Sequence, residues 1–211
     1  MTILGKERQV RKQEELRQTI LAAARDIISR EGFPGLSIRK ITQAIDYSPA
    51  IIYHYFKDKD EIVKALLSEG YARIISSIGM VEKNEAEPEK EIQQAFTNYI
   101  KAALASPEEY KAFMLNADAA ILEKTALLSQ GISQTSRTLQ VLCDNIQRGI
   151  SQGRYVPCDP ELTAQIFWTS TFGLIIKLIL EKEIPQEQID RLVDRHFSLL
   201  FNGIRKEELK T

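Results

Sequence analysis

The sequence predicts an all-α protein of about nine helices, and three observations support this fold class. Apolar residues recur at helical spacing along most of the 211 residues, and no long stretch alternates polar and apolar residues as a half-buried strand would. The β-branched residues fall within the same helical patterns. Only 7 prolines and 10 glycines interrupt the chain. Because 44% of the residues are hydrophobic, a chain of this length can bury the core of one or two domains.

The individual helices follow from this spacing. A first helix is expected over residues 13–31, where Leu16, Ile20 and Ile27 share one face and Gly32 ends the helix. Two short helices follow between residues 37 and 56. Six further helices are expected over the ranges 59–80, 89–105, 107–128, 133–152, 162–180 and 186–206.

Residues 36–59, LSIRKITQAIDYSPAIIYHYFKDK, carry most of the functional information. Ser37 is placed to cap one helix, and Asp46 stands where the chain must turn, in a left-handed conformation that Asp tolerates. Ser48 is placed to cap a second helix, in which Pro49 takes the first position. Two short helices that cross at a turn can place the second helix in the major groove of DNA. The segment therefore predicts a helix-turn-helix that reads DNA.

This segment resembles the DNA-binding signature of TetR-type (TetR/AcrR) transcriptional regulators over about residues 16–62. Three positions depart from the family pattern: Thr42 replaces an Ala, Asp46 a turn Gly and Tyr47 a Val. The remaining chain matches the family only in length and helical layout. The residues that carry the resemblance are Gly32, Phe33, Ser37, Ile41, Ala44, Ser48, Ile52, Tyr53, His54, Tyr55, Phe56 and Lys59.

The resemblance implies that a first domain, residues 1–60, binds DNA. Tyr53, Tyr55 and Lys59 are expected to contact phosphate. Arg39 is either a solvated surface charge or a contact to a base edge, and His54 faces either DNA or water. The full set of residues expected at the DNA is Ser37, Arg39, Lys40, Ser48, Pro49, Ala50, Ile51, Tyr53, His54, Tyr55, Lys57 and Lys59.

Two neighbours of these residues are expected in the core instead. Ile52 and Phe56 share a helical face with Ile45 and Ile62, which favours packing over DNA contact.

Charge is unevenly distributed, although the whole chain has a net charge of only −1. Residues 1–60 hold 11 basic and 8 acidic residues, whereas the remaining chain holds 17 and 21. A basic end on an acidic body fits a DNA-facing domain joined to one that does not face DNA. Residues 6–12, KERQVRK, form a basic arm before the first helix, which either lies along a DNA groove or acts as a solubilising tail.

Residues 61–211 are expected to form a larger ligand-binding and dimerisation domain. The stretch 162–180 contains one charge, Lys177, and several polar side chains, so a helix buried in the core or between subunits is favoured over a membrane span. Together with residues 186–206 it would supply half of a four-helix bundle across a two-fold axis, which agrees with how the resembled family dimerises. His196 is expected to be a satisfied interface histidine, with a ligand or pH role as the alternative.

In the resembled family the middle helices enclose a pocket, and its small-molecule ligand changes the spacing of the DNA-binding domains. Plain core packing is the alternative for every candidate pocket residue here. A pocket of this kind suits a hydrophobic drug, a fatty acyl group or an aromatic compound. The candidates are Tyr99, Phe113, Met114, Asn116, Asp118, Gln140, Trp168 and Phe172.

The sequence therefore predicts a ligand-responsive operator-binding regulator, most often a repressor, that works as a cytoplasmic homodimer. No cofactor is expected, and the two cysteines and two histidines lack metal-ligand spacing. Charge rather than an apolar run follows Met1, so no signal peptide is expected. One alternative is an all-helical enzyme that uses Asp118 and Glu123 as an acid–base pair. Another is a helical ligand-binding protein or adaptor without DNA-binding activity.

Overall fold

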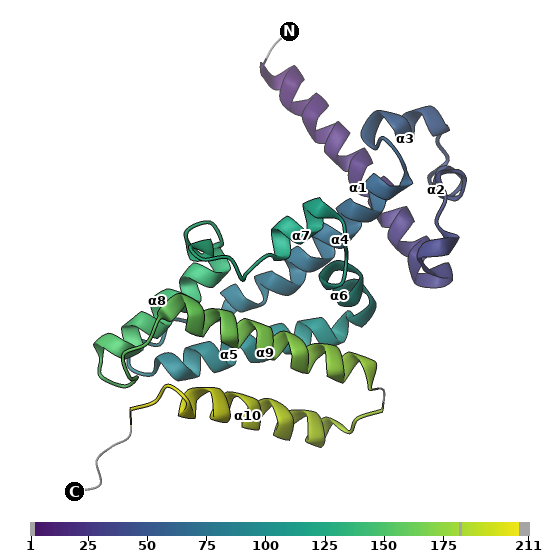
Figure 1. Cartoon of the computed structure of the whole chain (residues 1–211). Helices are drawn as coiled ribbons and strands as arrows, with labels where there is room; N and C mark the ends of the chain where they lie inside the picture. Colours follow the sequence, from purple (N-terminus) through teal and green to yellow (C-terminus); the bar gives the residue numbers. More distant parts are fainter. Residues whose placement is uncertain (1–2, 182, 207–211) are drawn as a thin grey trace, which may run out of the picture. The chain divides into compact units, whose positions relative to one another are not determined.

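The computed structural model describes residues 3–181 and 183–206. These residues form ten α-helices and two short 3-10 helices, with no β-strand among them beyond an isolated bridge between Tyr155 and Arg205. The all-α prediction is confirmed. The chain divides into two compact units, one up to Gly70 (the N-terminal unit) and one from Tyr71 onward (the C-terminal unit). Figure 1 shows the helices in chain order.

The division between the units falls inside one helix, α4, which spans Lys59–Ser76. The boundary expected from the sequence, between residues 60 and 61, lies in the same helix ten residues earlier. It stays a prediction for where the DNA-binding function ends.

The N-terminal unit consists of α1 (Ile3–Gly35), α2 (Ile38–Ile45), α3 (Pro49–Tyr55) and the first part of α4. The expectation that Ile52 and Phe56 lie in the core is confirmed, because they are 0% and 3% exposed. The buried core of this unit comprises Ile20, Leu21, Ala24, Ile27, Leu36, Ile41, Ile52, Phe56, Ile62 and Leu66.

Helix α1 begins at Ile3, ten residues before the start predicted from the sequence. Residues 6–12 are helical rather than a separate arm before the helix. These residues are mostly Lys, Arg, Glu and Gln, which are good helix formers, and Arg11 forms an i,i+4 ion pair of 2.9 Å with Glu15. The expected break at Gly32 is confirmed, since its φ of 72° departs from helical geometry and favours glycine.

The turn between α2 and α3 follows the predicted capping with one exception. The Ser37 hydroxyl accepts a bond from the Lys40 amide at 3.3 Å, and Asp46 takes the left-handed conformation at φ 56° and ψ 46°. Pro49 opens α3 as expected. Ser48 occupies the N-cap position of α3 as predicted, but its side chain makes no capping bond. With Pro49 as the next residue, one backbone donor at this helix start is already absent.

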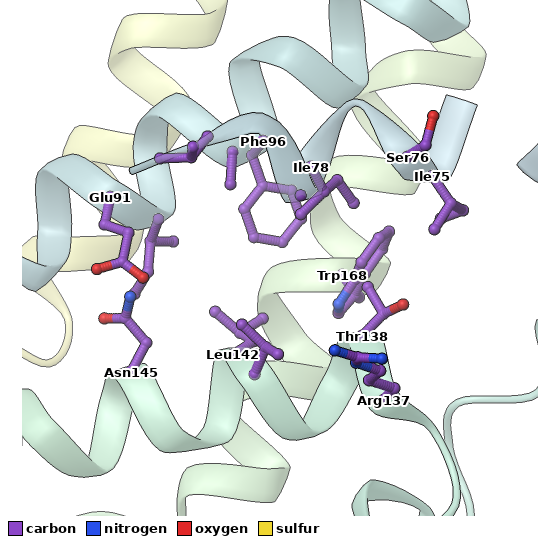
Figure 2. A pocket seen from close by; sticks show the side chains of 15 residues that line it. Ile75, Ser76, Ile78, Glu91, Phe96, Arg137, Thr138, Leu142, Asn145 and Trp168 are labelled. Carbon is purple, nitrogen blue, oxygen red and sulfur yellow. The ribbon is translucent and has the colours of Figure 1, made fainter. Parts of the chain in front are cut away.

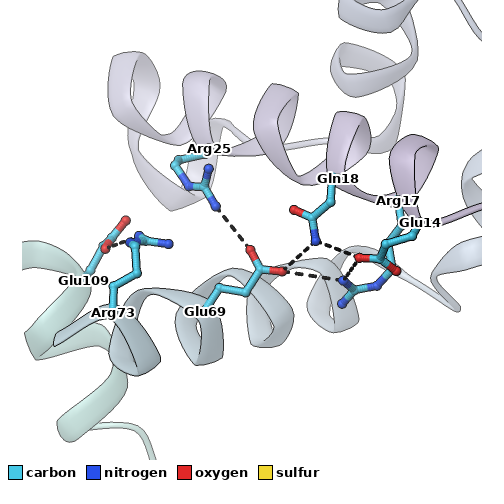
Figure 3. A network of polar contacts seen from close by, with 7 residues as sticks. All are labelled: Glu14, Arg17, Gln18, Arg25, Glu69, Arg73 and Glu109. Carbon is cyan, nitrogen blue, oxygen red and sulfur yellow. Dashed lines mark hydrogen bonds and ion pairs between the residues drawn. The ribbon is translucent and has the colours of Figure 1, made fainter. Parts of the chain in front are cut away.

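Helices α1 and α4 are joined by a polar network around Glu69 (Figure 3). The Glu69 carboxylate accepts from Arg17 at 3.5 Å, from Gln18 at 3.4 Å and from Arg25 at 3.2 Å. The Arg17 guanidinium also lies 5.5 Å from the centre of the Phe56 ring. These contacts position α4, and with it the chain that leaves α3.

The C-terminal unit is a bundle in which α9 (Pro160–Leu180) packs against α5 (Pro88–Ala105), α8 (Arg137–Ser151) and α10 (Gln186–Asn202) (Figure 1). Aromatic rings fill its centre. Phe96 lies 5.1 Å from Trp168 and 5.5 Å from Phe197, measured between ring centroids. Phe167 and Phe201 extend the same cluster at 5.4 Å.

The helix expected over residues 107–128 is in fact two, α6 (Pro107–Met114) and α7 (Ala119–Thr125). The break has a local cause. The Asn116 side chain accepts from the Asp118 amide at 2.9 Å, and Asp118 in turn caps α7 by accepting from the Ala120 amide at 3.1 Å. Short polar side chains thereby replace the helical backbone bonds at this point.

Two further predicted boundaries shift. Helix α4 ends at Ser76 and is followed by a 3-10 turn, Ile78–Met80. Helix α8 starts at Arg137 because the Ser136 hydroxyl caps it, accepting from the Leu139 amide at 3.4 Å. The residues before it form a second 3-10 turn, Ile132–Gln134, that Glu161 holds by accepting from the backbone amides of Gly131 and Ser133.

Among the described residues, α9 alone has the length and apolar composition of a membrane span. Its inward face nevertheless carries polar groups with partners inside the bundle. Gln165 donates to the carbonyl oxygen of Leu127 at 2.8 Å, and the Thr171 hydroxyl lies 3.1 Å from Nε2 of His196. The helix thus packs as the core helix that the sequence favours, and His196 is satisfied by a hydrogen bond.

Candidate functional site

The residues expected at DNA lie on α2, on α3, at the N-cap positions of these two helices, and on the chain from the end of α3 to the first residue of α4. Eight of them are exposed: Arg39, Lys40, Ser48, Pro49, Ala50, Tyr53, His54 and Lys57. Four are half-buried: Ser37, Ile51, Tyr55 and Lys59. The structure therefore brings the set together on the helix-turn-helix, and their contact with DNA stays a prediction.

Helix α3 is held by its inward residues and offers its other face to solvent. Ile52 and the following Phe56 are buried, one turn apart, so the side chains between them point elsewhere. Tyr53 is 57% exposed although it is a large aromatic residue. The His54 and Tyr55 rings meet edge to face with centroids 5.3 Å apart. An exposed tyrosine beside a histidine offers hydrogen-bond donors to a phosphate.

The chain that leaves α3 is fixed by reciprocal capping. The Asp58 carboxylate accepts from the Glu61 amide at 2.8 Å, and the Glu61 carboxylate accepts from the Lys57 amide at 2.5 Å. Lys59 is the first residue of α4. A cation there opposes the helix dipole, whereas Asp60 and Glu61 in the same turn favour it. We therefore expect the Lys59 ammonium itself, rather than the helix start, to attract a DNA phosphate.

On α2, the two candidate cations differ in their surroundings. The Lys40 ammonium is paired with Glu31 and donates to the carbonyl oxygen of Gly35 at 3.1 Å. The hydrogen bond from Lys40 lowers the pKa of Glu31, so this carboxylate stays ionised and competes with phosphate for the ammonium. Arg39 is exposed, and the Thr42 hydroxyl donates to its backbone carbonyl at 2.8 Å.

The three departures from the family pattern are each accommodated. Thr42 is 7% exposed and its hydroxyl is bonded within α2. Asp46 adopts the left-handed conformation that a turn glycine would take. Tyr47, 47% exposed, reaches the surface instead of crowding the core.

Several of the expected pocket residues belong to the packed interior of the C-terminal unit. The Tyr99 and Tyr110 hydroxyls lie 3.2 Å apart, and burial raises the pKa of Tyr99 well above its ordinary value. Phe113 stacks on Tyr71 with ring centroids 4.2 Å apart, and Tyr99 meets the edge of Trp168 at 5.0 Å.

The other candidates are spread over the unit. Met114 ends α6, while Asn116 and Asp118 form the turn before α7. Gln140 is exposed on α8, and Phe172 is half-buried on α9. Their part in ligand binding stays a prediction.

A cavity of about 360 Å³ lies between α5, α8 and α9 and the turn that follows α4. Figure 2 shows the apolar side chains of Ile78, Phe96 and Leu142 in its middle. Trp168 is the one expected pocket residue among its lining. The full lining is Ile75, Ser76, Ile78, Gly79, Val81, Glu91, Ile92, Ala95, Phe96, Arg137, Thr138, Val141, Leu142, Asn145 and Trp168.

Two buried polar atoms in this lining lack hydrogen-bond partners, the indole Nε1 of Trp168 and Oδ1 of Asn145. Both residues are only 4% exposed, so neither atom is served by solvent at the surface. A buried donor or acceptor without a partner costs about 1–3 kcal/mol. An ordered water or a ligand in the cavity can supply the missing partners.

Arg137 and Asn145 line the cavity but were not predicted from the sequence. A signal for Asn145 was present, because it interrupts the apolar face of α8 between Leu142 and Ile146. A polar residue at a core position of an amphipathic helix marks either a buried network or a cavity. Arg137 gave the same kind of signal as Lys59, because it is a cation at the first position of a helix, where it opposes the helix dipole.

Comparison with known proteins identifies the N-terminal unit. Residues 20–66 match the model of the tetR family of bacterial regulatory proteins. The chain is 36% identical over 69 residues to the HTH-type transcriptional repressor AcnR of Corynebacterium glutamicum. That alignment covers 31% of this chain and 37% of AcnR, so the chain spans little more than a third of the length of this relative.

Other similarities extend over both units. The HTH-type transcriptional regulator YhgD of Bacillus subtilis is 24% identical over 184 residues, which cover 83% of this chain and 88% of YhgD. A crystal structure of a transcriptional regulator of the TetR/AcrR family from Thermobifida fusca superposes with a TM-score of 0.65 at 18% identity. It covers 91% of this chain and 100% of the other, which establishes a shared fold.

Proposed function

From the similarity of residues 20–66 to the tetR family of bacterial regulatory proteins, we propose that the chain is a ligand-responsive transcriptional repressor of this family. As a homodimer in the cytoplasm it binds a palindromic DNA operator, and a small hydrophobic ligand releases it. The DNA-binding part rests mainly on the surface formed by α3 and the start of α4. Tyr53, His54 and Lys57 are exposed there, half-buried Lys59 follows them, and hydrogen bonds fix the turn between the two helices.

Two substitutions divide DNA affinity from sequence preference. Lys59→Ala removes a phosphate contact, so binding weakens on all sequences and the slope of log affinity against log salt falls by about 1. Arg39→Ala removes a base contact and costs about 1–3 kcal/mol on the preferred sequence only. Fluorescence anisotropy with labelled duplexes at several salt concentrations measures both effects, and Lys101→Ala, an exposed cation of the C-terminal unit, is the matched control. Unchanged binding in both variants would refute the proposed surface.

The homodimer part is supported by an exposed apolar stripe on α9 and α10. Leu162, Ile166 and Leu180 are each more than half exposed along one face of α9, and Gly173 on that face leaves open space around it. On α10, Leu199 is 56% exposed. Exposed apolar residues that align on one face of a helix are typical of a subunit interface, and the same two helices were expected to dimerise.

Ile166→Arg tests this interface by sedimentation velocity. A buried, unpaired guanidinium in the interface should convert the dimer to monomer and abolish operator binding, because each half-site would be bound alone. Leu128→Arg is the control, since Leu128 is 70% exposed outside α9 and α10. A dimer that persists in Ile166→Arg would place the interface elsewhere.

The release part of the proposal requires that the ligand bind the two conformations of the dimer with different affinity. The cavity between α5, α8 and α9 supports it, because an apolar space with a few buried polar groups is the usual form of a small-molecule site. The helical ligand-binding protein without DNA-binding activity remains the competing function, and the anisotropy experiment separates the two.

A further inference from the structure

We propose that the cavity beside α8 binds a carboxylic acid that has an apolar body and a hydroxyl group at its far end. The inference rests on the proposed function, because it names the chemical class of the effector. It is carried by the arrangement of Arg137, Trp168 and Asn145 along the cavity.

The charges around the cavity favour an anion. Two charged residues line it, Glu91 and Arg137. The Glu91 carboxylate is already compensated, since it accepts from the Arg148 guanidinium at 2.5 Å and from the Asn84 amide at 2.9 Å. Arg137 has no ion-pair partner among the residues that the structure describes. Arg137 is an exposed residue, so the cavity has one positive charge without an ion-pair partner at its solvent-facing edge, and a guanidinium pairs best with a planar carboxylate or a phosphate.

The carboxylate end lies where the donors gather. Figure 2 shows Arg137, Thr138 and the indole nitrogen of Trp168 at one end of the cavity. The indole N–H can only donate, and it is buried without an acceptor. The N-terminus of α8, where the Ser136 hydroxyl already accepts from the Leu139 amide, adds a positive helix dipole next to Arg137. A carboxylate brings two negatively charged acceptor oxygens to this end, which suit both the guanidinium and the indole N–H.

The opposite end has the reverse character. Figure 2 places Asn145 beside Glu91, away from Arg137. Oδ1 of Asn145 is a buried acceptor without a donor. A second anionic group is disfavoured there by the Glu91 carboxylate, whereas a hydroxyl donates to Oδ1 at no electrostatic cost. The two ends thus orient the ligand.

The space between the ends is apolar and of limited length. Thr138 and Asn145 lie seven residues apart on one face of α8, which corresponds to roughly 10 Å along the helix axis. Ile78, Phe96 and Leu142 line this stretch. A volume of about 360 Å³ is near the lower end for small-molecule sites, so the apolar body is a short chain or a single ring.

The lone tryptophan of the chain makes the test direct, because Trp168 itself lines the cavity. Three matched probes are titrated against the full-length protein while Trp168 fluorescence is recorded: 8-hydroxyoctanoate, octanoate and 1-octanol. We expect octanoate to bind at least about tenfold more tightly than 1-octanol, from charge-assisted bonds. The hydroxyl should add roughly three- to tenfold more, the usual net gain of one neutral hydrogen bond. Equal affinities for the three probes, or no fluorescence change with calorimetry confirming no binding, would overturn the proposal.

Two variants test which cavity residue binds each end of the ligand. Arg137→Gln should weaken octanoate by about tenfold or more while 1-octanol is unaffected. Asn145→Leu should erase the preference for 8-hydroxyoctanoate over octanoate without reducing octanoate binding. Arg195→Gln, an exposed arginine on α10, is the control and should change none of the affinities. A uniform loss across all three probes in Arg137→Gln would show a structural role for Arg137 and contradict its assignment.

Trp168 fluorescence does not involve DNA, so the proposed ligand class and the proposed DNA-binding function are tested separately. Carboxylate-selective binding without any effect on operator affinity supports the ligand class and refutes release by ligand. Operator binding with no carboxylate selectivity at Trp168 refutes the ligand class and leaves DNA binding intact.

Discussion

The two compact units hold their candidate sites in opposite ways. In the N-terminal unit the functional candidates point outward from a separate core: Tyr53 is 57% exposed, whereas Ile52 beside it is fully buried. In the C-terminal unit the cavity lies within the core. Phe96 and Trp168, each 4% exposed, line the cavity and also stabilise the bundle. Function and stability are therefore separable in the first unit and coupled in the second.

The largest expected difference comes from one aromatic residue in each unit. Phe96→Ala should lower the free energy of unfolding by about 3–5 kcal/mol, because it empties the space among Trp168 and Phe197. Tyr53→Ala should change it by less than about 0.5 kcal/mol while weakening DNA binding. Urea unfolding followed by circular dichroism measures both. Similar losses of unfolding free energy in the two variants would show that the two units do not differ in how function and stability are linked.

A glycine in the C-terminal unit should matter more than its size suggests. A Cβ at Gly149 would overlap the ring of Tyr155, which is 2% exposed and packs on Phe201. Gly149→Ala should therefore cost about 1–3 kcal/mol, although alanine favours helices. Thermal unfolding beside Gln147→Ala, an exposed position of the same helix, provides the measurement. A stabilised Gly149→Ala variant would show that Tyr155 is not packed against α8.

In the N-terminal unit the polar network around Glu69 should contribute moderately. Its three bonds are long and its side chain is 28% exposed, so Glu69→Ala should cost about 1 kcal/mol. The loss should shrink in high salt, because exposed ion pairs are screened. Glu15→Ala, which removes the exposed pair with Arg11, is the matched control for thermal unfolding. A cost equal to that of Phe96→Ala would contradict the view that packing dominates.

The smallest expected effect concerns pH. Burial lowers the pKa of His196 below its ordinary 6.5, so the unfolded chain binds more protons than the folded one as pH falls through 6.5. Acidification therefore lowers the free energy of unfolding through His196. The slope is at most about 1.4 kcal/mol per pH unit, which is the limit for one proton. The free energy of unfolding of the wild type should fall more than that of His196→Gln between pH 7.5 and 5.5. Parallel curves would remove His196 as a cause.

Much of the N-terminal unit could be predicted because its structure is local. The Ser37 cap, the left-handed Asp46, Pro49 at the helix start and the break at Gly32 each depend on a few adjacent residues. The face shared by Ile52 and Phe56 follows from helical spacing alone. Two details of helix ends were not predicted: α1 begins earlier than expected, and the Ser48 side chain makes no capping bond.

The C-terminal unit was predictable at the level of helices but not at the level of the cavity. Its walls come from residues 75–96, 137–145 and 168, and only packing in three dimensions brings these segments together. Residue type pointed to aromatic residues such as Tyr99 and Phe113, which pack in the interior around Tyr110 and Tyr71. Asn145 was detectable as a polar break in an apolar face, whereas the role proposed for Arg137 depends on what surrounds it.

The central claim is specific reading of DNA by a dimer. Its most direct test is selection of bound fragments from randomised duplex DNA with purified full-length protein at near-physiological salt. We expect an inverted repeat whose two half-sites lie one helical turn apart, with their centres separated by about 34–36 Å. Recovery of no sequence motif by folded, dimeric protein would contradict it and leave the cavity of the C-terminal unit as the functional site.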